Sequence, residues 1–209
     1  VRFKLDTAYA PFFAAIPIAA DLRQLAPQFD YDRRMAESIS KIDVTLGYIL
    51  HGEGFRTGEM PASHVDLAPE LVQRSSVEHM VGHTTNIPVL QQTARGQGFI
   101  NGPPDSDGIV RRAPLMLRYG DQLFPSLALQ TAMTYLLLDS VTPTVINDGS
   151  AVYVQSIELG DKLIHTDGKG QMLVPYRGHR GSFPYIPAVD VLQGKADPAQ
   201  LSGSIAMVG

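Results

Sequence analysis

The chain has 209 residues, 44% of them hydrophobic and 18% charged, with a net charge of −4 at pH 7 and no cysteine. This composition is typical of one folded globular domain, and the acidic balance disfavours nucleic acid as a partner. The lack of cysteine excludes disulfide bonds, thiolate zinc sites and thiol nucleophiles. The absence of cysteine suits an oxidising compartment, but many cytosolic domains also lack cysteine. It therefore does not determine the cellular compartment.

A membrane-spanning helix needs about 18 or more consecutive apolar residues. The nearest candidate, residues 8–20, is interrupted by Pro11 and Pro17. The opening sequence VRFKLD lacks the apolar stretch that follows the charges of a signal peptide. We therefore expect neither a membrane span nor a signal peptide within this stretch.

The first predicted elements are helices. Apolar residues recur through residues 19–41, but Pro27 divides the pattern. This predicts a short helix followed by a second one that begins near Asp30 or Asp32, because an acidic side chain is favourable at a helix N-terminus.

The next elements lead to a strand that ends at a proline pair. Residues 44–50 are short and almost wholly apolar, which predicts a strand covered on both faces. Residues 52–63 are polar with several glycines and predict a loop, whereas residues 88–95 predict a short helix. A strand then begins at Phe99 and must end at Asn101-Gly102-Pro103-Pro104, since proline donates no hydrogen bond to a strand ladder.

A turn, a hairpin and a buried helix follow. Asp105-Ser106-Asp107-Gly108 predicts a turn, because aspartate side chains bond to nearby amides and glycine adopts a positive φ. Residues 109–123 predict an antiparallel hairpin with its tip at Tyr119-Gly120-Asp121-Gln122. Residues 126–138 predict a mostly apolar helix with Ser126 as its cap, packed against a sheet.

The last third of the chain is predicted to be mainly strands. Residues 145–146 and 152–154 flank the turn 147–150, and Gly160-Asp161 forms the tip of a further hairpin. Further strands are expected at 172–176 and 205–208. The whole pattern predicts one mixed α/β domain with a central mixed sheet, an antiparallel meander and helices packed on the sheet.

Two blocks of sequence identify a family resemblance. Residues 98–115 have the form G-F-x-N-x-x-P-D-x-D-G-x-x-R-R-x-P-L, followed by Pro125-Ser126-Leu127-Ala128. Downstream lie VPYRG at 174–178, FPY at 183–185, AVDVL at 188–192 and GSIAMVG at 203–209. Both blocks resemble the second CHASE family, sensory domains found outside the membrane in bacterial cyclases and kinases. The resemblance covers residues 41–209, and residues 1–40 fit it only through the helix near Asp30.

This resemblance implies a non-catalytic, ligand-sensing domain in the periplasmic or extracellular part of a bacterial inner-membrane receptor. It implies membrane helices outside this chain and a cytoplasmic output domain: an adenylate or guanylate cyclase, a histidine kinase or a serine/threonine kinase. Because such output domains work as dimers, a homodimer is expected. The ligand would be a small molecule or a periplasmic protein, with no cofactor.

The acidic turn and a histidine pair are the candidates for metal binding. Asp105 and Asp107 look like the start of a calcium loop, but six residues beyond Asp107 the chain has Ala113 where that loop has glutamate. We therefore predict a structural turn in which Arg111 or Arg112 pairs with an aspartate. His79 and His83 have helical metal-ligand spacing, but Gly82 disfavours a helix there and no third ligand is near. No metal site is predicted.

The loop after residue 175 is the candidate for ligand binding. Tyr176, Arg177, His179 and Arg180 stand among glycines, and paired arginine donors suit a carboxylate or phosphate. The alternative is that Arg177 pairs inside the domain with Asp107 or Asp190 and fixes the loop.

A second functional class remains open from the residues alone. The chain could be a small soluble α/β enzyme that uses Asp105, Asp107 and Arg177 for acid and base chemistry, which requires a carboxyl group with a shifted pKa. However, no hydrolase serine elbow and no phosphate-binding glycine motif is present. We therefore predict no catalytic residue in this chain.

Overall fold

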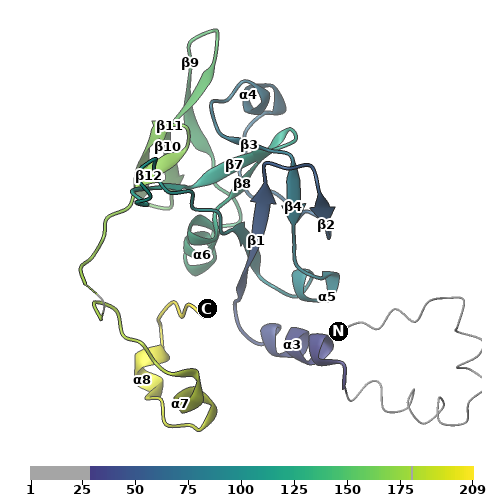
Figure 1. The fold of residues 1–209 in the computed structure, drawn as a ribbon, viewed down its shortest axis with the longest axis vertical. Coiled ribbons are helices and arrows are strands. Elements are labelled where there is room, and N and C mark those ends of the chain that lie inside the picture. Colours follow the sequence, from purple (N-terminus) through teal and green to yellow (C-terminus); the bar gives the residue numbers. More distant parts are fainter. Residues whose placement is uncertain (1–28, 180) are drawn as a thin grey trace, which may run out of the picture.

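The computed structural model describes residues 29–179 and 181–209, and it confirms a mixed α/β fold (Figure 1). In this part of the chain, strands outnumber helices. The helices are α3 (Tyr31–Ile39), α4 (Pro69–Gln73), α5 (Pro88–Gln91), α6 (Leu127–Tyr135), α7 (Ala188–Leu192) and α8 (Pro198–Leu201). The strands are β1 (Thr45–His51), β2 (Arg56–Thr57), β3 (His79–Met80), β4 (Gly82–Thr84), β5 (Gly96–Phe99), β6 (Arg112–Pro114), β7 (Met116–Tyr119), β8 (Gln122–Pro125), β9 (Pro143–Asn147), β10 (Val152–Leu159), β11 (Lys162–Gly168) and β12 (Gln171–Leu173).

Two small sheets share one continuous segment of chain. The first sheet has the order β2-β4-β1-β5, with β1 parallel to β5 and antiparallel to β4. The second has the order β3-β7-β8, and its β7–β8 hairpin is the predicted antiparallel pair. Since β3 and β4 are separated by Val81 alone, residues 79–84 tie the two sheets together. A bridge between Phe99 and Ser126 joins them again at the end of β8.

The apolar residues of these strands form a compact core between the two sheets. Its buried members are Tyr48, Leu50, Met80, Phe99 and Leu117. A second and larger core lies where α6 and the hairpin β7–β8 meet the sheet β11-β10-β9, and it includes Met116, Leu129, Met133, Val154 and Ile157. Leu129 and Met133 are 2% and 0% exposed, so α6 is packed as predicted.

The helix α6 approaches β5 at unusually close range. A Cβ atom on Gly98 would lie 2.5 Å from both the backbone N and the Cα of Leu127. Both atoms belong to the first turn of α6, where Ser126 caps the helix by accepting a hydrogen bond from the backbone N–H of Leu129 (3.2 Å). Only glycine therefore allows this separation between strand and helix.

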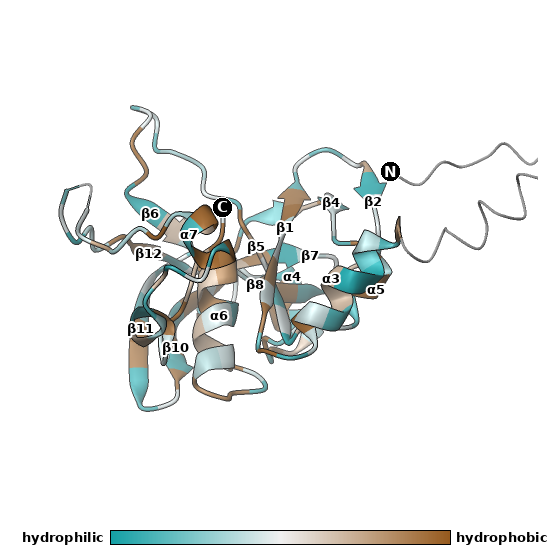
Figure 2. Cartoon of the chain, turned by 90° about the horizontal axis from the view of Figure 1, so that it is seen from below, coloured by the Kyte–Doolittle hydropathy of each residue, from teal (hydrophilic) through white to brown (hydrophobic). Residues whose placement is uncertain are grey.

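The last 36 residues run clear of the sheets. We refer to residues 174–209 as the C-terminal arm and to residues 43–173 as the body. After β12 the arm extends away from the body and carries α7 and α8 (Figure 1). Figure 2 shows hydrophobic positions on α7. Large apolar side chains on the arm are exposed, including Tyr185 (80%), Leu192 (87%) and Met207 (87%).

Three sequence predictions about packing or pairing are wrong. Residues 205–208 form no strand, because no neighbouring strand pairs with them. Ile49 is 39% exposed, so β1 is not fully covered on both faces. The helix expected to end at Leu138 ends at Tyr135, and Leu137 takes a φ of 57°, which leaves its side chain 71% exposed. The short helix expected before Pro27 lies outside the described residues.

Two predicted boundaries are also wrong: β5 ends at Phe99, where a strand was predicted to begin, and the segment predicted as a loop at 52–63 contains β2. Other elements agree with the sequence predictions. The helix α3 begins after Asp30, whose side chain accepts a hydrogen bond from the backbone N–H of Arg33 (3.0 Å). The hairpins β9–β10 and β10–β11 form at the predicted turns. Within the described residues, no helix has the length and apolar character that crossing a membrane requires.

We predict that Gly98→Ala lowers the free energy of unfolding by about 1–3 kcal/mol, the usual cost of forcing an extra group into a packed site. The matched control is Gly102→Ala, because a Cβ at Gly102 would meet no atom within 4 Å. Urea unfolding of both variants measures the difference. Equal midpoints for the two variants would contradict the close contact.

Candidate functional site

The acidic turn is built mainly by backbone hydrogen bonds. The N–H of Gly108 donates to the carbonyl of Asp105 (2.8 Å), and the N–H of Asp105 donates to the carbonyl of Ile109 (2.9 Å). The carboxylate of Asp107 accepts from the N–H of Ile109 (3.1 Å). Gly108 has a φ of 80°, which explains why the turn has glycine at this position.

Two arginines face this turn. The guanidinium of Arg111 donates two hydrogen bonds to the carboxylate of Asp107, at 2.8 and 2.7 Å. It also lies 3.3 Å from a carboxylate oxygen of Asp105, and Arg112 lies 3.4 Å from the other oxygen. The side chains of Arg111 and Asp107 are 47% and 50% exposed, so this is a surface network and its contribution to stability is modest.

The charges of the network shift its pKa values in a direction that opposes acid–base catalysis. Hydrogen bonds from Arg111 and then from the N–H of Ile109 lower the pKa of Asp107. The same pairing raises the pKa of Arg111. A general acid needs a raised carboxyl pKa instead. In addition, Arg177 forms no ion pair with Asp105 or Asp107 within the described residues. The structure therefore does not assemble the residues of the enzyme hypothesis into one site.

The loop predicted to bind a ligand begins next to this network. The hydroxyl of Tyr176 donates to the carbonyl of Val110, and the N–H of Val174 donates to the carbonyl of Arg111 (2.9 Å). Beyond this anchor the loop is exposed, with the ring of Tyr176 69% accessible. The carbonyl of His179 accepts from the N–H (3.1 Å) and hydroxyl (2.8 Å) of Ser182.

The alternative prediction for this loop was an internal ion pair of Arg177. Arg177 forms no ion pair with Asp107 or Asp190 among the described residues. Arg180 lies outside the described residues. Gly178 and Gly181 have φ values of 138° and 92°, so both bends require glycine.

The two histidines with metal-ligand spacing lie on separate strands. His79 is exposed on β3, whereas His83 is 5% exposed on β4. The Nδ1 atom of His83 lies 3.1 Å from the hydroxyl of Tyr119, and its Nε2 atom lies 3.3 Å from the carbonyl of Gly58. His83 is therefore a core histidine held by hydrogen bonds. No cluster of three or more potential metal-binding side chains occurs among residues 29–179 and 181–209.

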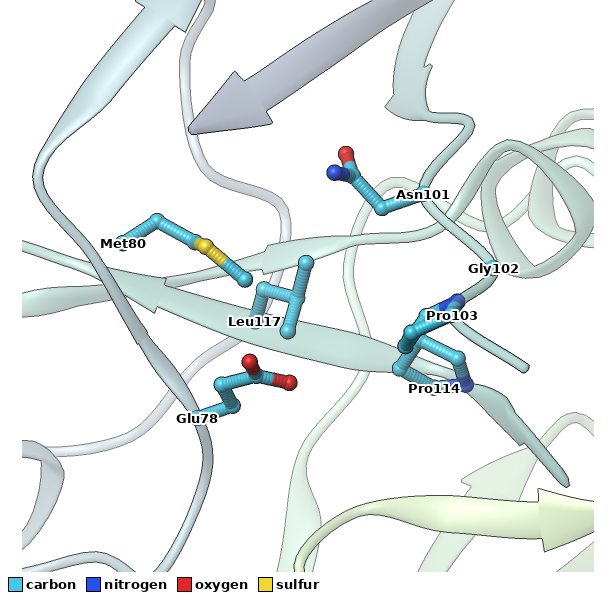
Figure 3. Close-up of a pocket in the computed structure, with 7 residues that line it drawn as sticks. All are labelled: Glu78, Met80, Asn101, Gly102, Pro103, Pro114 and Leu117. Atoms are coloured by element: carbon cyan, nitrogen blue, oxygen red, sulfur yellow. The ribbon is translucent and has the colours of Figure 1, made fainter. Parts of the chain in front are cut away.

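A cavity lies at a place that the sequence did not indicate (Figure 3). It is open to solvent and has a volume of about 320 Å³. Its wall is formed by Glu78, Met80, Asn101, Gly102, Pro103, Pro114 and Leu117. These residues come from three separate stretches of chain, 78–80, 101–103 and 114–117, so no local motif could reveal the site. A second cavity of about 530 Å³, lined by residue 63, residues 65–69, Asp121 and Gln122, lies elsewhere on the body.

Comparison with known proteins identifies the family. The family model of the CHASE2 domain matches residues 12–209, nearly the whole chain. The chain belongs to the CHASE2 family. The match begins well before residue 41, where the resemblance began, and it also includes the C-terminal arm. CHASE2 domains are extracytoplasmic, sensory and non-catalytic. No curated protein and no solved structure gave a significant match to the chain.

We predict that the ion pair between Asp107 and Arg111 makes the stability of the domain depend on pH. Because the pKa of Asp107 is lowered by folding, its contribution is present above the unfolded value of about 3.9 and is lost as the pH falls through the folded pKa. The Asp107→Asn variant should therefore be less stable than the wild type at pH 6, and the difference in stability should shrink at pH 3. Urea midpoints across this range measure the difference.

The control for this prediction removes the cause of the shift. In an Arg111→Ala background, Asp107→Asn should change the urea midpoint at pH 6 by a smaller amount. An effect of undiminished size would show that Arg111 does not act on Asp107.

Proposed function

We propose that this CHASE2 domain is the sensory part of a bacterial transmembrane receptor and controls a cytoplasmic output domain. That output domain would be an adenylate or guanylate cyclase, a histidine kinase or a serine/threonine kinase. The observation that carries the proposal is the family match over residues 12–209, since the family is sensory and extracytoplasmic. A ligand would act by binding one of two arrangements of the domain more tightly than the other.

The surface of the arm supports self-association. Many large apolar side chains on residues 183–208 are exposed, and such side chains mark interaction sites where they form one patch. Because the family match includes the arm, these residues are part of the domain and not of a linker. We propose that the arm contributes to a homodimer.

The exposed loop at the base of the arm supports anion binding. Arg177, His179 and Arg180 concentrate positive charge in a chain whose net charge is −4. The hydrogen bond from Tyr176 to Val110 fixes the start of this loop on the body. A carboxylate or phosphate bound there would contact the first residues of the arm.

The receptor assignment is tested on the parent gene. We expect apolar segments of about 20 residues to flank this stretch, followed by a catalytic output domain. A gene without such segments would contradict the receptor proposal.

The proposed dimer is tested with two substitutions of matched chemistry. Leu192→Ser removes an 87% exposed leucine of the arm, and Leu163→Ser removes a 52% exposed leucine of β11 on the body. We expect the arm variant, but not the body variant, to weaken self-association measured by light scattering coupled to size exclusion. Equal behaviour of both variants would remove the arm from the interface.

The proposed anion site is tested by NMR titration with acetate and inorganic phosphate. Amide shifts should centre on residues 176–182 and should weaken in Arg177→Ala. The matched control, Arg74→Ala, removes an exposed arginine bonded to Gly149 and Asn147 elsewhere on the body. Shifts that persist in Arg177→Ala would place anion binding at another surface.

A further inference from the structure

The cavity of Figure 3 has an apolar floor and two prolines on one side. Met80 and Leu117 form the floor and are 8% and 1% exposed, because they also belong to the core between the two sheets. Pro103 and Pro114 form the side, and their rings hold φ near −65°. The fixed proline angles restrict the backbone on this side, and such preorganisation lowers the cost of binding a small apolar group.

Asn101 is a fixed polar group on this wall. Its Oδ1 accepts a hydrogen bond from the N–H of Leu50 (3.0 Å), and its Nδ2 donates to the carbonyl of Leu50 (2.8 Å). These two bonds hold the amide in one orientation. They leave a second lone pair on the oxygen and a second N–H on the nitrogen for other partners.

Glu78 supplies the charge of the cavity. Its carboxylate lies on the opposite side of Leu117 from Asn101 (Figure 3). No ion pair to Glu78 is formed within the described residues, although several other acids of the body have arginine or lysine partners. An exposed carboxylate beside an apolar floor attracts a cation, and the net charge of −4 adds to that attraction.

We propose that this cavity binds a small organic ammonium ion, with the ammonium group at Glu78 and the apolar body of the ligand on Met80 and Leu117. The volume of about 320 Å³ lies at the lower end of the range for ligand sites, so the ligand is small. This assignment rests on the proposed sensory function and names the chemical class that the domain would detect. The site is distinct from the cationic loop at residues 176–180.

Benzylammonium is the probe for this site, with benzyl alcohol and benzoate as neutral and anionic compounds of similar shape. We expect saturable NMR shifts of the methyl groups of Met80 and Leu117 with benzylammonium, and weaker effects with the other two compounds. No saturable shift at these methyl groups, or equal affinity for benzyl alcohol, would overturn the proposal.

Two charge variants test the role of the carboxylate. Glu78→Gln should weaken benzylammonium binding about twofold to fivefold, the range expected for an exposed ion pair. Glu158→Gln removes an exposed carboxylate of β10 outside the cavity and should leave the affinity unchanged. An equal loss in both variants would show a general effect of net charge and would overturn the assignment to Glu78.

Reversing the charge at residue 78 gives a test that does not depend on measuring small differences in affinity. Glu78→Lys should abolish the methyl shifts with benzylammonium and produce them with benzoate. Benzylammonium shifts that survive this change would also overturn the proposal. These measurements use the isolated chain, so a negative result rejects the cation site, whereas the receptor proposal fails only on the parent gene.

Discussion

The close contact between β5 and the first turn of α6 sets the spacing at the centre of this domain. Gly98 allows the helix backbone to lie where a side chain would otherwise stand. The same contact places Ser126 beside Phe99, where a bridge joins the two small sheets. Once this distance is fixed, Met133 and Leu129 fill one core from the helix side, while Phe99 completes the other core on the strand side.

Asn101 and the two prolines after it determine the direction of the chain after β5. The side chain of Asn101, in place of backbone groups, bonds to both the N–H and the carbonyl of Leu50 where the ladder between β1 and β5 ends. The prolines that follow cannot continue the ladder, so the chain turns away from β1 and forms the cavity wall and the acidic turn. A single stretch therefore ends the strand, shapes the cavity and positions Asp105.

The sequence predicted features that depend on neighbours in the chain. The caps at Asp30 and Ser126, the turn at Gly108 and the hairpin at Gly120 all arise from local rules of backbone geometry. Pairing between distant segments follows no such rule. The sequence could not show that residues 79–84 divide between two sheets, or that the apolar residues 205–208 would lack a partner strand.

The candidate sites differ in the same way: some are formed by residues close in sequence, and one is formed by distant residues. The motif that carried the family resemblance also contains the Asp107–Arg111 pair, because the two residues are four positions apart. The cavity joins Glu78, Asn101 and Pro114, which no spacing rule connects. Conversely, the cationic loop was visible in sequence because its three basic residues lie within four positions of the chain, although the side chains of Arg177 and His179 are exposed to solvent.

The backbone offers a short physical route from the cavity to the arm. Pro114 in the cavity wall is the register partner of Gln171 at the start of β12, and β12 leads directly into the arm. The hydrogen bonds from Val174 to Arg111 and from Tyr176 to Val110 continue this pairing past the strand end. A ligand that moved Pro114 would therefore act on the same ladder that anchors the arm. Such a ligand shifts the position of the arm only if it binds one arrangement of β6 and β12 more tightly than the other, which is the thermodynamic condition for any sensor.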